Sequence, residues 1–208
     1  MAGIAGTTIR DDTGDRHRRK YENRNPLQRL ALGRFHDEAA ETIRALAPRS
    51  VLDFGCGEGF LAEKLIERGV ALDGYVGVDL RAEALADARR RLPGLRFVEA
   101  DILVWPETSA RFDLVLASQV LEHLPNPEQF LARLCEACSG RLILTVPHEP
   151  WFQLLNLARG RDLPRLGNHP EHINRWTSEA FADFVAAGAV VERVWPVFPF
   201  TFVLARPR

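Results

Sequence analysis

A glycine-rich loop is the first place in this sequence where residue type and spacing suggest chemistry. The loop, Gly55-Cys56-Gly57-Glu58-Gly59, follows the apolar run 51–54 and precedes a helical pattern that begins at Phe60. Glycines at such a junction adopt positive φ angles without a Cβ clash and let the backbone approach a ligand closely. We therefore predict a ligand-binding turn, the alternative being a loop chosen only for tight turning.

Acidic residues end the next two strand-like runs. Asp79 lies about 20 residues after Gly59, a position where a carboxylate accepts both hydroxyls of a ribose. Asp101, followed by Ile102, ends the run 95–100. A carboxylate suits the exocyclic amine of adenine, and an aliphatic side chain suits the face of its ring. The glycine loop and the two acids therefore predict an adenosine-containing cofactor.

The loop does not fit a dinucleotide. A dinucleotide fingerprint places a third glycine three residues after the second, where the pyrophosphate meets the start of the helix. In this sequence the corresponding position is the bulky Phe60, and Glu58 would repel a pyrophosphate. The spacing favours a zwitterionic ligand without phosphates over NAD.

Further blocks continue the pattern along the chain. They are 51–59 (VLDFGCGEG), 77–79 (GVD), 99–102 (EADI), and 112–115 (FDLV) with 121–124 (LEHL). Each block alone is a weak signal of any family, but the four blocks in this order and at this spacing are a strong one. With this set the chain resembles the class I S-adenosylmethionine-dependent methyltransferases, most of all the small bacterial type 11 group.

The resemblance implies an α/β fold with a Rossmann-like, mostly parallel seven-stranded sheet, an antiparallel last strand and helices on both faces. It also implies S-adenosylmethionine as cofactor, bound across the carboxyl ends of the first strands. The expected roles are as follows: Asp53 and the backbone of Gly55, Cys56, Gly57 and Gly59 hold the methionine part, Asp79 with its neighbour Leu80 the ribose, and Asp101 with Ile102 the adenine, while Ser118 and Gln119 line the methyl-transfer gap.

Histidines are the natural candidates for a general base. The sulfonium methyl is already activated, so a base is needed only for a protonated acceptor such as a hydroxyl or an amine. Among the histidines of the second half of the chain, we favour His172 and His123 as catalytic residues over His148 and His169. The competing interpretation of each one is a structural, hydrogen-bonding histidine.

Two other functions compete with methylation of a small molecule. Glu122, His123 and His172 resemble part of the metal-binding set of the bacterial Hen1-like RNA 2′-O-methyltransferases, but Gln119 stands where that family has a glutamate. We therefore predict no metal site. The other alternative is a non-catalytic module that binds S-adenosylmethionine and regulates a partner.

The rest of the sequence supplies the elements that would position these residues. Apolar runs alternate with helical patterns, which predicts parallel strands covered by helices on both faces. The last two strands are joined by only four residues, so we expect them to pair as an antiparallel hairpin. The predicted strands are 51–54, 75–79, 95–100, 112–117, 141–146, 190–195 and 200–205; the predicted helices are 26–46, 60–68, 82–92, 127–137 and 178–187.

We interpret residues 1–208 as a single methyltransferase domain with three additions. Residues 1–20 are predicted to be a flexible leader, 21–48 a helical extension, and 147–176 a cap inserted after the fifth strand. The cap begins with the amphipathic piece 151–158. Several aromatic residues could form either an apolar acceptor pocket or ordinary core: Trp151, Phe152, Trp176, Trp195, Phe198 and Phe200.

The amino-acid composition limits the kinds of partner and the compartment that we expect. The 27 basic and 28 acidic side chains give a formal net charge of -1, which provides no overall attraction to nucleic acid. The 3 cysteines are too few for a disulfide scaffold and favour a reducing compartment, by default the cytoplasm. No run reaches the roughly 18 apolar residues of a transmembrane segment. We expect a small or lipophilic acceptor, methylated at oxygen, and leave the oligomeric state open.

Overall fold

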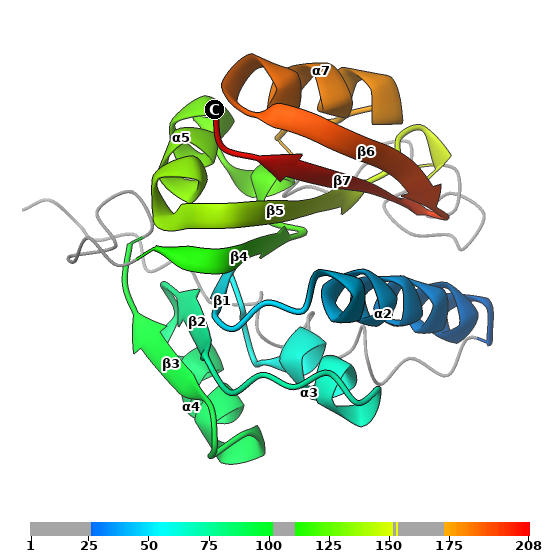
Figure 1. Cartoon of the computed structure of the whole chain (residues 1–208). Helices are drawn as coiled ribbons and strands as arrows, with labels where there is room; N and C mark the ends of the chain where they lie inside the picture. The colour runs from blue at the N-terminus through cyan, green and yellow to red at the C-terminus, as the bar shows by residue number, and fades with distance from the viewer. Residues whose placement is uncertain (1–25, 102–110, 152, 154–172) are drawn as a thin grey trace, which may run out of the picture.

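A single twisted sheet forms the centre of the fold (Figure 1). The computed structural model describes residues 26–101, 111–151, 153 and 173–208. Within them, the strands lie in the order β3-β2-β1-β4-β5-β7-β6. Their bounds are β1 Val51–Phe54, β2 Tyr75–Asp79, β3 Arg96–Glu99, β4 Phe112–Ser118, β5 Cys138–Pro147, β6 Val190–Val197 and β7 Phe200–Arg206.

Most of the sheet is parallel, and its last strand is reversed. β1 pairs with β2 and β4, β2 with β3, and β4 with β5, all in parallel. β7 is antiparallel to both β5 and β6, and it lies between them. The predicted hairpin and the predicted seven-stranded α/β fold are therefore confirmed.

Helices cover both faces of the sheet, as predicted. One face packs against α2 (Pro26–Leu46), α3 (Phe60–Glu67) and α4 (Ala82–Arg91), and the other against α5 (Pro127–Ala137) and α7 (Ser178–Gly188) (Figure 1). α2 fits its face because Phe35, Ala39 and Ile43 recur at helical spacing and are buried. The parallel strands are buried on both sides, which explains their nearly continuous apolar runs.

Local signals set the element ends close to their predicted positions. Gly59, with a φ of 76°, turns the chain into α3, and the Thr177 hydroxyl accepts a hydrogen bond from Ala180 N at the start of α7. β5 is longer than predicted and begins at Cys138 instead of Arg141. Gly140 allows this, because a Cβ there would lie 2.2 Å from the carbonyl oxygen of Asp113 on the neighbouring strand.

Several predictions concern segments outside the described residues. The leader 1–20, Ile102, His169, His172 and most of the cap 147–176 belong to them. Of the amphipathic piece 151–158, only Trp151 and Gln153 are described. In the part of the chain that is described, no helix has both the length and the apolar character needed to cross a membrane.

Candidate active site

The glycine loop leaves the sheet at the carboxyl end of β1. Gly55, Gly57 and Gly59 all have positive φ angles, of 72°, 54° and 76°. The N–H groups of Gly55 and Cys56 donate to the carbonyl of Val78 on β2, at 2.8 and 3.1 Å. A Cβ on Gly55 would lie 2.5 Å from a methyl carbon of Val120. Both the conformation and the space around Gly55 therefore require glycine.

Asp79 is fixed beside this loop by backbone and side-chain donors. Gly57 N donates to Asp79 Oδ2 at 2.9 Å, and Arg81 donates to Oδ1 from its backbone N at 2.9 Å and from Nε at 3.3 Å. Arg81 also lies 3.7 Å from Glu58 Oε1, which partly balances that buried carboxylate. Among the described residues, a Cβ on Gly57 would contact Arg81 alone, at 3.4 Å, so the loop backbone is open on that side.

Asp53 is a buried acid at the base of the site. Its exposed fraction is 2%, and Tyr75 donates its hydroxyl hydrogen to Asp53 Oδ2 at 2.8 Å. Burial raises the pKa of Asp53 to about 7; the Tyr75 hydrogen bond acts against this shift, and the nearby Asp79 adds to it. Burial, with the charges of Asp53 and Asp79, also raises the pKa of the Cys56 thiol, which favours the neutral thiol.

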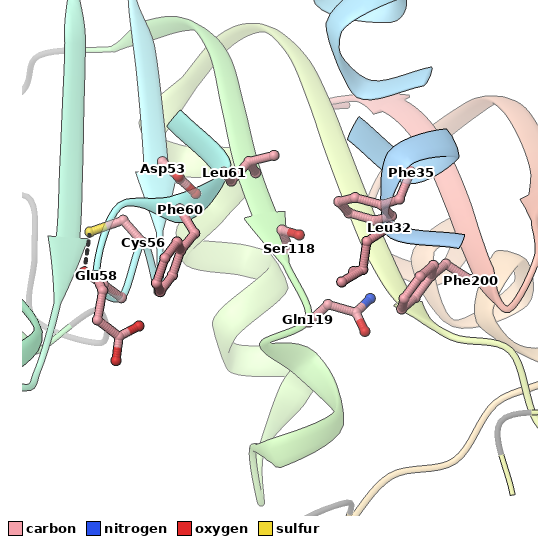
Figure 2. Close-up of a pocket in the computed structure, with 12 residues that line it drawn as sticks. Leu32, Phe35, Asp53, Cys56, Glu58, Phe60, Leu61, Ser118, Gln119 and Phe200 are labelled. Carbon is pink, nitrogen blue, oxygen red and sulfur yellow. Dashed lines mark hydrogen bonds between the residues drawn. The ribbon is translucent and has the colours of Figure 1, made fainter. Parts of the chain in front are cut away.

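A pocket opens between the loop and the start of β7, and its two sides differ in chemistry (Figure 2). We name one side the loop side and the other the apolar wall; Ser118 and Gln119, at the end of β4, lie between them. The loop side consists of Asp53, Gly55, Cys56, Gly57, Glu58, Phe60 and Leu61, and the apolar wall of Leu32, Phe35 and Phe200. The rings of Phe35 and Phe200 meet edge to face at 4.9 Å.

Gln119 is held in an unusual backbone conformation. Its φ is 59°, a value rare for residues other than glycine and frequent at functional positions. Its backbone N donates to Thr145 O at 3.0 Å, and its side-chain Nε2 donates to Thr145 Oγ1 at 3.3 Å. Thr145 in turn donates to Ser118 Oγ at 3.2 Å. This chain of hydrogen bonds orients the Gln119 side-chain amide. Within the described part of the chain, no hydrogen bond is made by the side-chain oxygen Oε1 of Gln119 or donated by the Ser118 hydroxyl, so both face the pocket as groups for a ligand.

The histidines have different surroundings. His123 lies in the short 3-10 turn η1 (Leu121–His123), where its Nε2 is 3.9 Å from Glu122 Oε1, and it is not among the described residues that line the pocket. His148 Nδ1 shares hydrogen bonds with Ser178 at 2.8 Å and Thr201 at 3.2 Å, a structural arrangement. His172 is outside the described residues.

The chain that follows His172 is anchored to the η1 turn. Ile173 N and Asn174 N both donate to Glu122 O, at 2.8 and 3.0 Å. Asn174 Nδ2 donates to the carbonyls of Leu121 and Leu124. The end of the cap is thus attached next to His123. Among the described residues, no three His, Cys, Asp or Glu side chains lie together as a metal site would require.

Most of the predicted cofactor residues come together. The pocket is lined by Asp53, Gly55, Cys56, Gly57, Ser118 and Gln119, and Asp79 is joined to it through Gly57. Gly59 lies at the end of the loop and is not itself a lining residue. Leu80 is 65% exposed, and Asp101 is exposed just after β3. Ile102 is outside the described residues.

Sequence reasoning missed Tyr75, Arg81, Thr145 and the residues Leu32 and Phe35 of α2. A signal existed for Tyr75: it is a phenol in a strand that otherwise holds only small or apolar residues before Asp79.

The aromatic residues named from the sequence lie in three kinds of place. Phe200 lines the pocket; Trp195 and Trp176 pack in the two cores, and Trp151 and Phe198 are half exposed.

Comparison with known proteins identifies a family. Residues 16–188 match a methyltransferase domain family. Trans-aconitate 2-methyltransferase of Rhodopseudomonas palustris (strain BisB5) is 34% identical over 164 residues, which are 64% of this chain and 62% of the relative. The enzyme of the same name from Rhizobium etli is 38% identical over 120 residues, 54% of this chain and 46% of the relative. The chain thus spans about half to three fifths of these relatives.

Solved structures share the fold. Magnesium protoporphyrin IX methyltransferase from Synechocystis PCC 6803, with bound SAH, has a TM-score of 0.69 at 19% identity, covering 93% of this chain and 94% of that one. The methyltransferase domain of a bacterial Hen1 has a TM-score of 0.69 at 18% identity, covering 85% and 98%. At these identities the likeness establishes the fold alone.

The chemical groups on the loop side also suit S-adenosylmethionine, independently of the family match. The open backbone at Gly57 admits a ligand closely, and the carboxylates of Asp53 and Asp79 suit the ammonium and hydroxyl groups of S-adenosylmethionine. The fold, the loop and the family match agree. The chain belongs to the methyltransferase domain family and has the class I, Rossmann-like fold of S-adenosylmethionine-dependent methyltransferases.

Proposed function

We propose that this enzyme methylates an oxygen atom of a small acceptor whose body is apolar. The observation that carries the proposal is the apolar wall. Leu32 and Phe35 from α2 and Phe200 from β7 form one side of the pocket, and the two phenylalanine rings contact each other. An acceptor with an apolar body gains free energy by covering this wall, whereas a multiply charged one would lose hydration there.

On the loop side, the proposed roles concern the cofactor. S-adenosylmethionine, when bound, supplies a methyl group on an electrophilic sulfonium. Asp53 and the backbone of Gly55–Gly59 would hold its amino-acid part, and Asp79, fixed by Gly57 and Arg81, its ribose. Asp101 and Ile102 are proposed to hold the adenine. These groups bind and orient, so that the acceptor atom meets the methyl group in line.

Ser118 and Gln119 are proposed to position the acceptor. Their hydrogen-bond chain through Thr145 leaves a hydroxyl donor and a carbonyl acceptor between the loop side and the apolar wall. A hydroxyl or carboxyl oxygen on an otherwise apolar molecule would be recognised by this pair. The backbone hydrogen bond from Gln119 N to Thr145 O helps to keep the pair in place before binding.

His123 and His172 are the proposed bases for a protonated acceptor. Oε1 of Glu122 lies 3.9 Å from His123 Nε2, so Glu122 is placed to orient this imidazole. The attachment of Ile173 and Asn174 to Glu122 supports a shared neighbourhood for the cap and the η1 turn.

The relatives support oxygen as the methylated atom. They are named for trans-aconitate, a tricarboxylate that has no nitrogen and offers oxygen atoms. The two proposals about the acceptor, its atom and its apolar body, thus rest on different observations and can fail separately.

The test is a matched panel of acceptors with S-adenosylmethionine carrying a labelled methyl group. An aromatic carboxylic acid, a phenol, an amine of the same carbon skeleton and trans-aconitate are compared by kcat/KM. We expect the carboxylic acid or the phenol to exceed trans-aconitate at least about tenfold. Preference for the amine would overturn oxygen, and preference for trans-aconitate would overturn the apolar body.

A variant of the wall separates the acceptor classes further. Leu32→Arg introduces a cation at a partly buried wall position. It should lower turnover of the apolar acceptors, whereas an enzyme built for a tricarboxylate should gain. Methylation of a short RNA that requires an added divalent cation would instead support the Hen1-like alternative.

A further inference from the structure

Tyr75 is a buried polar side chain that contacts Asp53, a residue of the loop side. It begins β2, its exposed fraction is 3%, and its ring meets that of Phe97 edge to face at 5.9 Å. Its hydroxyl has a hydrogen-bond partner in this core, since it donates to Asp53 Oδ2 at 2.8 Å. A buried hydroxyl and a buried carboxyl thus satisfy each other.

The register of the sheet explains why the two side chains meet. Asp53 on β1 stands opposite Gly77 on β2. Tyr75 precedes Gly77 by two positions, so its side chain lies on the same face of the sheet as Asp53. A Cβ on Gly77 would lie 2.8 Å from Cys56 Sγ and 2.7 Å from Phe97, so this stretch of β2 is closely packed beneath the loop. The contact is therefore built into the strand pairing.

The hydrogen bond uses only one oxygen of Asp53. Among the described residues, no hydrogen bond reaches Oδ1, although Asp53 lines the pocket. The charged and titratable groups around it are Tyr75 and Asp79 from β2, Cys56 and Glu58 from the loop, and Arg81 after β2. From α2 and α3 the pocket receives Leu32, Phe35 and Leu61, which carry no charge. Tyr75 is the side chain that donates a hydrogen bond to this carboxyl group.

We propose that Tyr75 is a positioning residue of the cofactor site. Its hydroxyl fixes Asp53 Oδ2 and leaves Oδ1 for the cationic amino-acid part of S-adenosylmethionine. This role rests on the proposed role of Asp53. It has a second consequence, because a donor to a buried carboxylate favours the charged form. Burial alone raises the pKa of Asp53, and the Tyr75 hydrogen bond opposes that rise.

The experiment measures the dissociation constant of S-adenosylhomocysteine from pH 6 to 9.5 for the wild type and Tyr75→Phe. The ligand's own titration cancels in the ratio of the two constants at each pH. We expect the variant to bind about tenfold more weakly below pH 7, because more of its Asp53 is protonated, and the ratio to fall toward one by pH 9.5. A ratio that is the same at every pH would overturn the proposal, since a purely structural defect does not follow this titration.

Two control variants complete the design. Phe97→Leu disturbs the packing of the Tyr75 ring but leaves its hydroxyl, so its ratio to the wild type should not change with pH. Asp53→Asn removes the titrating group, so its binding should be weak and should lack the titration near pH 7 that the wild type shows. If the wild type fails to bind S-adenosylhomocysteine at any pH, the cofactor role of Asp53 fails together with that of Tyr75; if it binds and Tyr75→Phe shows a constant ratio, only Tyr75 fails.

The stability of the ligand-free proteins gives a readout independent of binding. Loss of the Tyr75 hydrogen bond raises the pKa of Asp53 further, so unfolding temperatures of Tyr75→Phe should keep falling, relative to Phe97→Leu, as pH rises from 7 to 9. Parallel curves for the two variants would count against the proposal. This comparison also covers a variant that binds too weakly to measure.

Discussion

The two sides of the pocket are built in different ways. The loop side comes from one short stretch of chain, the end of β1, its loop and the start of α3. Hydrogen bonds join Gly57 of this stretch to Asp79 on β2, which also accepts from Arg81. The apolar wall combines α2 with the start of β7, which are far apart in the sequence, and is held by ring contacts between Phe35 and Phe200.

This difference suggests that specificity for the cofactor and specificity for the acceptor have separate structural origins. The cofactor, a ligand with fixed charges and hydroxyls, is proposed to bind where glycines and hydrogen bonds dictate the backbone conformation. The acceptor is proposed to meet side chains whose shape depends on tertiary packing, which tolerates exchange between apolar residues more readily. Damage to the loop side should therefore affect cofactor binding, and damage to the wall should affect the acceptor.

The largest expected effect comes from Gly55→Ala. The new methyl group would meet Val120 at 2.5 Å in a backbone with φ of 72°, so the loop must shift. We expect a loss of stability of roughly 2 kcal/mol and about 100-fold weaker cofactor binding, measured by calorimetry. Gly33→Ala is the control, because no atom of the described residues lies within 4 Å of its new Cβ; it should bind normally. Normal binding by Gly55→Ala would contradict the rigid-loop argument.

Phe200→Leu should affect the wall alone. It shortens a buried ring that contacts Phe35 but keeps an apolar side chain. We expect kcat/KM for an apolar acceptor to fall about tenfold, with the cofactor dissociation constant within about twofold of the wild type. Steady-state kinetics and calorimetry on the same preparation measure both. Equal damage to cofactor binding would show that the two sides are not separable.

Gln119→Leu tests the boundary between the sides. The change removes both the donor to Thr145 and the carbonyl oxygen offered to the acceptor. We expect kcat to fall about fivefold, within the range for a lost hydrogen bond, without a change in cofactor affinity. Thr145→Val, which loses only the anchor, should show the same direction and a smaller loss. An effect confined to cofactor affinity would place Gln119 functionally on the loop side.

Asp53→Asn tests the loop side without ligand, through a change in stability that depends on pH. Because Asp53 has a pKa of about 7 in the folded protein, above its unfolded value, the folded state holds a proton that the unfolded chain releases. The wild type therefore loses stability as pH rises from about 4 to 7 and then levels off, whereas the amide does not titrate. Without ligand, the variant should melt several degrees above the wild type at pH 8 and near it at pH 4, as thermal unfolding at the two pH values would show. An identical pH dependence would contradict this account.

The sequence predicted the local parts of the fold and site well. Strand and helix ranges were correct to within a few residues because Val/Leu runs and glycine or proline boundaries are local signals, as at α2 and α5. The positions of Asp53, Gly57 and Asp79 followed from motif spacing. β5 was predicted too short because Ser139 and Gly140 resemble a turn, while close packing against Asp113 keeps them in the strand.

Contacts between residues that are far apart in the chain could not be predicted from the sequence. Nothing local indicates that Leu32 and Phe35 face Phe200, because that contact depends on how α2 crosses the sheet. The Tyr75–Asp53 bond required the strand register, in which Asp53 faces Gly77. The hydrogen-bond chain of Gln119 required the neighbouring strand β5, which supplies Thr145.

The reversed strand β7 has a consequence for how such enzymes diverge. Because it runs against β5, its first residue, Phe200, pairs with Pro147 at the edge where β5 ends, and His148 N donates to Pro199 O there. The hairpin of β6 and β7 thus brings a wall residue to the pocket independently of β1 and β4. Under the proposed role of the wall, replacing this hairpin together with α2 would change the acceptor and leave the loop side as it is.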